Sequence, residues 1–111
     1  MKHCRNILSL QPIYTNHEFS VFRTKRGYII VNSKKDFYNK KKQEYGHTHV
    51  KNKKTAIKIA DFSYNKKMPH DLNPYLLSCL ARITTDQKYK KEIENLLINK
   101  KNRRQKYANY F

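Results

Sequence analysis

Two histidines separated by a single residue form the most suggestive short motif in the chain. His47, Thr48 and His49 lie in a β-prone stretch, and alternate residues of a strand project from the same face. This is the spacing of a general acid and base, or of two metal ligands. A zinc site needs a third and usually a fourth ligand. The loose candidates for those positions are Cys4, His17 and His70.

Other catalytic signatures are weak. The carboxylates are scattered, without the cluster that a magnesium-dependent nuclease requires, and two glycines in the whole chain leave no glycine-rich phosphate loop. No Ser/His/Asp or Cys/His arrangement stands out. For His47 and His49, a structural or nucleic-acid-contacting role, catalysis and metal binding all stay open. We expect no enzyme, no metal and no cofactor; if the protein is an enzyme, these two histidines are its catalytic pair.

Basic residues offer a different chemistry. The chain has 25 Lys and Arg against eight Asp and Glu, a net charge of +17. Clustered cations neutralise phosphates and release their counterions, which gives salt-sensitive binding. The basic groups gather in a hairpin turn, a central lysine-rich stretch and a C-terminal run. The predicted nucleic-acid-binding residues are Lys25, Arg26, Lys40, Lys41, Lys42, Lys51, Lys53, Lys54, Lys100, Lys101, Arg103 and Arg104.

Two explanations account for this charge. One is contact with a polyanion, and the other is an A/T-rich coding sequence, which favours Lys, Asn, Ile and Tyr without selection for binding. The same coding bias would raise Asp and Glu, which are scarce, so contact with nucleic acid is favoured. Aromatic rings among the cations suit stacking on unpaired bases, although Tyr in a small domain is usually half-buried core. These rings are Phe37, Tyr38, Tyr45, Tyr107, Tyr110 and Phe111.

Strands are expected in the first half of the chain. Residues 18–23 alternate, with Phe19 and Val21 on one face, and residues 28–31 return as the partner strand. Residues 24–27 form the turn, because Gly27 can adopt a positive φ. Residues 45–50 predict a third strand. A weaker strand or turn signal at residues 7–10 stops at Pro12.

Three helices are expected in the second half, where the apolar period changes from two to about 3.6. Thr55 is the predicted N-cap of the first, which fades at residues 64–65. Asn73 caps the second, a buried central helix with Pro74 at its first position. Thr84 and Gln87 match a capping box for the third, which runs to about residue 107.

The predicted fold class is therefore α+β: a small antiparallel sheet, made of the hairpin and a third strand, followed by three α-helices in a single domain of residues 1–111. Helix residues should pack against the inner face of the sheet. The predicted contacts join Leu76, Leu77, Leu80, Ile83, Ile93, Leu96 and Leu97 to Phe19, Val21, Ile29 or Val31.

Cysteine content and hydropathy indicate where the protein works. Cys4 and Cys79 are too few for the disulfide framework of a small secreted protein. The N-terminal apolar stretch is too short and polar for a signal peptide, and no window reaches the ~20 apolar residues of a membrane helix. We expect a cytoplasmic protein that does not contact membrane.

Residues 23–30, 46–49 and 75–83 together resemble small phage and mobile-element proteins of low-G+C bacteria. The resemblance implies an accessory protein in the host cytoplasm, and that class includes anti-CRISPR inhibitors and other anti-defence proteins. Such inhibitors occupy a surface of a host effector complex. The basic charge departs from the acidic DNA mimics among them and suits a nucleic-acid-loaded target.

Three functions follow from these observations. The first is a basic, non-enzymatic protein that contacts nucleic acid or a host nucleoprotein complex through its Lys and Arg patches. The second is an anti-CRISPR-type inhibitor that occupies a surface of a host defence effector. The third is a small toxin-like ribonuclease in which His47 and His49 act as acid and base.

Overall fold

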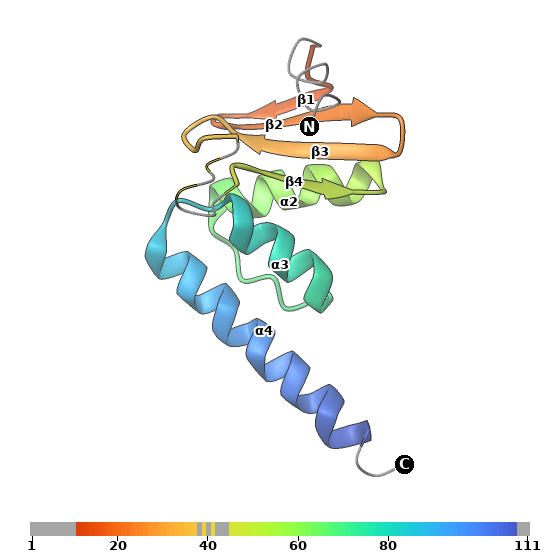
Figure 1. The fold of residues 1–111 in the computed structure, drawn as a ribbon, viewed down its shortest axis with the longest axis vertical. Helices are drawn as coiled ribbons and strands as arrows, with labels where there is room; N and C mark the ends of the chain where they lie inside the picture. The colour runs from red at the N-terminus through yellow and green to blue at the C-terminus, as the bar shows by residue number, and fades with distance from the viewer. Residues whose placement is uncertain (1–10, 38, 40, 42–44, 109–111) are drawn as a thin grey trace.

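The computed structural model describes residues 11–37, 39, 41 and 45–108, and the side chains of these residues up to 101. The signal at residues 7–10 therefore lies outside the described residues. A four-stranded antiparallel sheet precedes three helices, which confirms the predicted α+β class (Figure 1).

The strands lie in the sheet in the order in which they occur in the chain. They are β1 (Tyr14–Asn16), β2 (Phe19–Thr24), β3 (Gly27–Asn32) and β4 (His47–Val50), and each pairs antiparallel with the next. The hairpin and the third strand were expected. β1 was not, because three residues directly after Pro12 and Ile13 are too few for an alternating pattern.

The helices are α2 (Lys53–Asn65), α3 (Pro74–Ile83) and α4 (Gln87–Ala108). Asn73 caps α3 as predicted, but two other cap predictions were wrong. Asn52, and not Thr55, caps α2 by accepting a hydrogen bond from the Lys54 backbone N–H at 3.0 Å. Asp86 accepts from the Tyr89 N–H at 2.9 Å at the start of α4, while Thr84 ends α3. In both cases the cap is the Asn or Asp that directly precedes the first helical residue, whereas Thr55 lies inside α2 and Thr84 lies two residues before Asp86.

The helices form a layer on one face of the sheet. α2 crosses that face beneath the strands, α3 lies beside β4, and α4 packs against α3 and runs away from the sheet (Figure 1). Asn32, buried in β3, donates to the backbone carbonyl of Ile83 at 2.6 Å and joins the sheet to the end of α3. Among the described residues, no helix is long and apolar enough to span a membrane.

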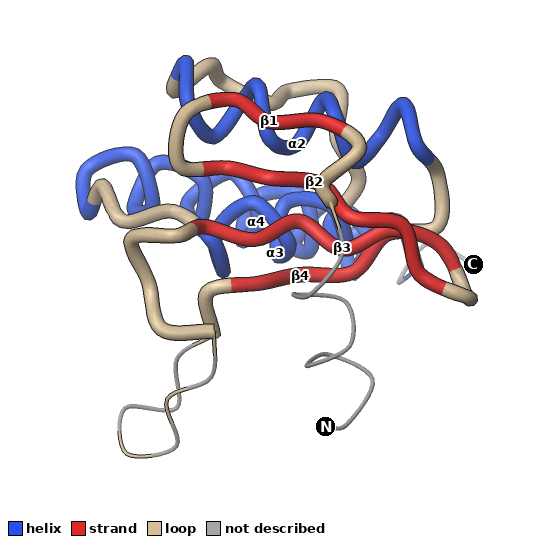
Figure 2. The backbone as a smooth tube through the Cα atoms, turned by 90° about the horizontal axis from the view of Figure 1, so that it is seen from above, coloured by secondary structure: helices blue, strands red, loops and turns tan. Residues whose placement is uncertain are grey.

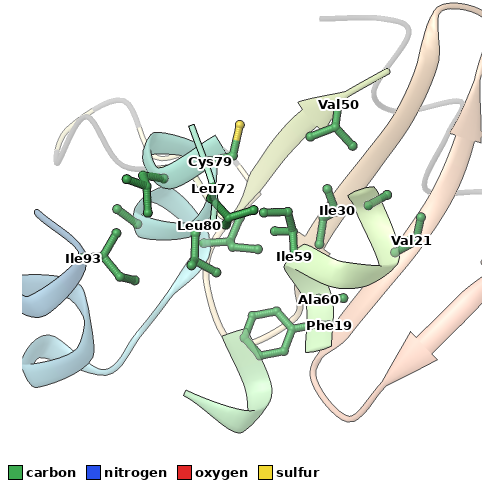
Figure 3. Close-up of a cluster of buried hydrophobic side chains, with 14 of the residues drawn as sticks. Phe19, Val21, Ile30, Val50, Ile59, Ala60, Leu72, Cys79, Leu80 and Ile93 are labelled. Carbon is green, nitrogen blue, oxygen red and sulfur yellow. The ribbon is translucent and has the colours of Figure 1, made fainter. Parts of the chain in front are cut away.

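The main core lies between the sheet and these helices. Phe19, Val21 and Ile30 meet Ile59 of α2 and Leu80 of α3 (Figure 3). Further members of the same cluster are Leu77, Ile83 and Ile93, with Leu76, Leu96 and Leu97 partly buried against it.

Of the four strand residues predicted as possible partners of the helices, Phe19 and Val21 lie in this core, and Ile29 and Val31 do not. They lie on the other face of the sheet with Phe22 and Phe37. Strand alternation requires this, because Ile30 points inward and its two neighbours must therefore point outward.

Candidate nucleic-acid interface

A groove of about 1560 Å³ lies at the tip of the β2–β3 hairpin. It is bordered by the end of β4 and by the first residues of α2 and α3, so three loops far apart in sequence meet there. In Figure 1 the orange hairpin turn, the end of the β4 arrow and the beginning of α2 lie on the same side of the molecule. We call this feature the hairpin groove.

Four cationic side chains line the hairpin groove: Arg23, Lys25, Arg26 and Lys51. All four of these side chains are exposed. No Asp or Glu is among its lining residues in the described part of the chain. Because none of these described lining residues is acidic, the hairpin groove is a site of positive potential.

The hairpin turn is held against the end of β4 by a close backbone approach at Gly27. Thr24 pairs with Gly27, which leaves Lys25 and Arg26 as the two turn residues. Gly27 has φ 143°, and a Cβ on it would lie 2.6 Å from the carbonyl oxygen of Val50. Only glycine allows this approach, and it brings the turn cations next to Lys51.

Two helices begin at the rim of the hairpin groove. The residues that line the hairpin groove include Asn52 and Thr55 at the start of α2 and Asn73 at the start of α3. Neither helix has an acidic residue in its first turn. Lys53 and Lys54 are exposed in the first turn of α2, beside the hairpin groove. The positive ends of the two helix dipoles therefore add to the charge of the side chains.

Tyr75 supplies an aromatic surface in the hairpin groove. The residue is 61% exposed, yet its hydroxyl donates a hydrogen bond to the backbone carbonyl of His49 at 2.8 Å. Cys79 Sγ approaches the same oxygen at 3.8 Å. Desolvation is the largest of the effects that raise the pKa of Tyr75 above its ordinary value. These contacts also provide partners for one backbone carbonyl of β4, the edge strand of the sheet.

The two histidines of the sequence motif lie together, in different surroundings. Their ring centroids are 5.2 Å apart in an edge-to-face arrangement. His47 is 2% exposed, stacks on Phe37 at 4.2 Å and forms a hydrogen bond through Nδ1 to the Phe37 carbonyl at 2.9 Å. His49 lines the hairpin groove. Within the described ranges, no group of three His, Cys, Asp or Glu could hold a metal ion.

The remaining predicted basic residues lie elsewhere. Lys41 is exposed in the β3–β4 connection, at the sheet end opposite the hairpin turn (Figure 2), while Lys40 and Lys42 lie outside the described residues. Lys100 donates to the backbone carbonyls of His70 and Leu72, so it joins α4 to the α2–α3 loop.

The C-terminal run is also separate from the hairpin groove. Lys101 is exposed in the second half of α4. Arg103 and Arg104 belong to the same helix, but their side chains are not among those that the structure describes. In Figure 1 this end of α4 lies at the bottom of the long axis and the sheet at its top. The structure thus gathers Lys25, Arg26 and Lys51 but not the C-terminal cations.

Sequence reasoning missed Arg23, Tyr28, Asn73 and Tyr75 as residues of the hairpin groove. A signal for Tyr75 was present, because the exposed face of α3 repeats at helical spacing through Tyr75, Ser78 and Arg82. No local pattern in the sequence indicates that these three separate loops meet in space.

Several carboxylates of the described residues bond to parts of the protein other than the lining residues of the hairpin groove. Asp86 accepts from the Tyr89 N–H and pairs with Lys66 at 2.9 Å, and these contacts lower the pKa of Asp86. Lys58 likewise lowers the pKa of Asp71. The other bonded acids of the described chain are Glu18 with Lys34, Asp36 with Asn39, and Asp61 with Tyr14 and Asn16. None of these carboxylates lines the hairpin groove.

Comparison of the chain with protein families, curated proteins and solved structures finds no match in any of the three.

Proposed function

We propose that the protein binds nucleic acid through the hairpin groove. The observation that carries this proposal is the convergence of Arg23, Lys25, Arg26 and Lys51 on one concave surface, with no carboxylate among the described residues that line it. Arg presents a planar fork that matches phosphate oxygens, and Lys adds mobile point charge. A strand with phosphates at regular spacing satisfies several such groups at once.

The position of the acids supports the same function. A codon-driven excess of lysine would place cations over the whole surface, with acids distributed among them. Here Asp71 and Asp86 pair with Lys58 and Lys66, none of which lines the hairpin groove, so neither of these carboxylates is paired with a lining cation. Lysines elsewhere still contribute to long-range attraction of a polyanion.

The test is a salt titration with a short labelled oligonucleotide, measured by fluorescence anisotropy. If the four lining cations each neutralise one phosphate of a single strand, log affinity should fall against log salt with a slope of about −2.8. That corresponds to roughly a 50-fold loss between about 50 and 200 mM salt. The double substitution Lys25→Ala with Lys51→Ala should weaken binding and reduce the slope by about 1.4.

The matched control changes Lys88 and Lys91 to Ala. Both lysines are exposed on α4 and do not line the hairpin groove, so the net charge falls equally. Equal weakening by both double variants would show that overall charge, and not the hairpin groove, determines binding. The recovered oligonucleotide should be intact with and without divalent metal; cleavage abolished by His49→Ala would contradict a binding role.

A further inference from the structure

Tyr75 is the most exposed large hydrophobic side chain in the described part of the protein. A single exposed ring is ordinary on a protein surface. This one lies in a groove with four cations, and no described residue of opposite charge lines that groove. An exposed ring by itself needs no explanation, but an exposed ring inside a cationic groove does.

The ring is also held in place. The hydrogen bond from the hydroxyl of Tyr75 to the His49 carbonyl fixes its far end against β4. Its backbone is fixed because Pro74 is the first residue of α3 and Asn73 accepts from the Leu76 N–H at 2.9 Å. An aromatic face fixed before binding loses little conformational entropy when a ligand stacks on it.

This combination distinguishes single strands from duplexes. In a duplex the faces of the bases are stacked on one another, so a protein reaches the backbone and the base edges but not the faces. In a single strand the bases are free to leave the stack while the phosphates remain available to Lys and Arg. We propose that the hairpin groove takes single-stranded nucleic acid, with its phosphates on Arg23, Lys25, Arg26 and Lys51 and an unpaired base stacked on Tyr75; this rests on the proposed function.

The decisive experiment compares two strands of equal length and equal charge, one of thymidine nucleotides and one abasic. Both carry the phosphates, but only the first carries rings. The wild-type protein should bind the thymidine strand roughly 5- to 150-fold more tightly, the range for one stacked base. Tyr75→Leu should abolish that preference, so that the variant binds the two strands with equal affinity. Tyr75→Phe keeps the ring, loses the hydrogen bond to His49 and should retain part of the preference.

Tyr64→Leu is the matched control. Tyr64 is also an exposed tyrosine, but it lies on α2, stacks on His17 and does not line the hairpin groove, so its loss should leave the preference intact. Circular dichroism should give native spectra for all three variants.

The outcomes separate the two proposals. Equal binding of the thymidine and abasic strands by the wild-type protein would overturn the stacking inference and leave nucleic-acid binding standing. A preference that survives Tyr75→Leu would also overturn it. Failure of the wild-type protein to bind either single strand would refute this inference, and failure to bind a duplex as well would refute nucleic-acid binding. The comparison of strands uses the unaltered protein, so it does not depend on any variant folding.

Discussion

At the scale of single residues, the most informative side chains are those whose surroundings differ most from what their type suggests. His47 is a potential acid or base that is almost wholly buried, stacked on Phe37 and bonded to its carbonyl. Tyr75 is an aromatic residue of an apolar helix that faces outward and is held there. The first therefore supports the sheet, and the second is available to a ligand.

Leu80 provides the residue-scale test of the core. It is 0% exposed and packs between the sheet and α4, so Leu80→Ala should lower the free energy of unfolding by about 2–5 kcal/mol. Ile98→Ala is the control, because Ile98 is an aliphatic residue of α4 that is 54% exposed; its effect should stay near 0.5 kcal/mol. Urea denaturation measures both. Similar losses for the two variants would contradict the burial of Leu80.

The sequence predicted which residues are buried better than it predicted which residues line the hairpin groove. The helical spacing of Leu77, Leu80 and Ile83 placed them correctly in the core, because burial repeats with the helix period. Arg23 and Tyr28 gave no such signal. Their role in the hairpin groove depends on where β4 and α3 end in space, which local periodicity does not encode.

At the scale of elements, the hairpin groove depends on where helices and strands begin and end. Gly27 brings the hairpin turn against β4, and Asn52 and Asn73 start two helices at the same rim. The sequence predicted the hairpin, the third strand and the start of α3, since turn and cap residues are strong local signals. It missed β1, and it misplaced the caps of α2 and α4 by a few residues, since several Asn, Asp and Thr compete at each start.

Asn73→Asp tests the role of the α3 start, because it changes charge without changing the cap. Asp and Asn cap helices about equally well, and Asp suits the positive end of the helix dipole, so the melting temperature should be unchanged or slightly higher. The added carboxylate lies among the cations of the hairpin groove. Affinity for a single strand should fall about fivefold at low salt, as expected for one unfavourable charge contact of about 1 kcal/mol.

Asn95→Asp is the companion variant. Asn95 is exposed on α4 and does not line the hairpin groove, so this change adds the same charge elsewhere. Anisotropy and thermal melts on both variants complete the test. If the two variants lose the same affinity, the α3 start does not border the binding site.

At the scale of the whole molecule, the net charge of +17 is distributed in a particular way. The bonded carboxylates join separate elements: Asp71 joins the α2–α3 loop to α2, and Asp86 joins the start of α4 to the end of α2. The sequence predicted the excess of cations, but neither this pairing nor the separation of the C-terminal run from the hairpin groove. Both depend on long-range packing between the elements.

The contacts of Asp71 and Asp86 predict how the stability of the protein depends on pH. Contacts from Tyr89 N–H and Lys66 lower the pKa of Asp86, and Lys58 lowers that of Asp71, relative to the unfolded chain. A lowered folded pKa gives stability that is present above the unfolded value near 3.9 and is lost as pH falls through the folded value. These two carboxylates should therefore contribute little change in melting temperature from about pH 7 to 5 and a decline below about pH 4.

Asp86→Asn isolates one contribution. Asn retains a cap for α4 but neither titrates nor pairs with Lys66, so the variant should melt lower than wild type at pH 7 and show a shallower acid decline. Thermal unfolding followed by circular dichroism from about pH 7 to 2 is the measurement. An acid decline as steep as that of the wild type would exclude Asp86 as a contributor.

The strands lie in the sheet in the order in which they occur in the chain, and this order affects how the protein folds. β1, β2 and β3 are joined by two-residue turns, so their pairings close short loops and lose little chain entropy. α2 follows directly on β4 and covers the apolar face of the finished sheet, whereas α4 packs mainly on α3. During synthesis the sheet and α2 can therefore come together while the last helix is still being made, and the hairpin groove takes shape once α3 has docked beside β4.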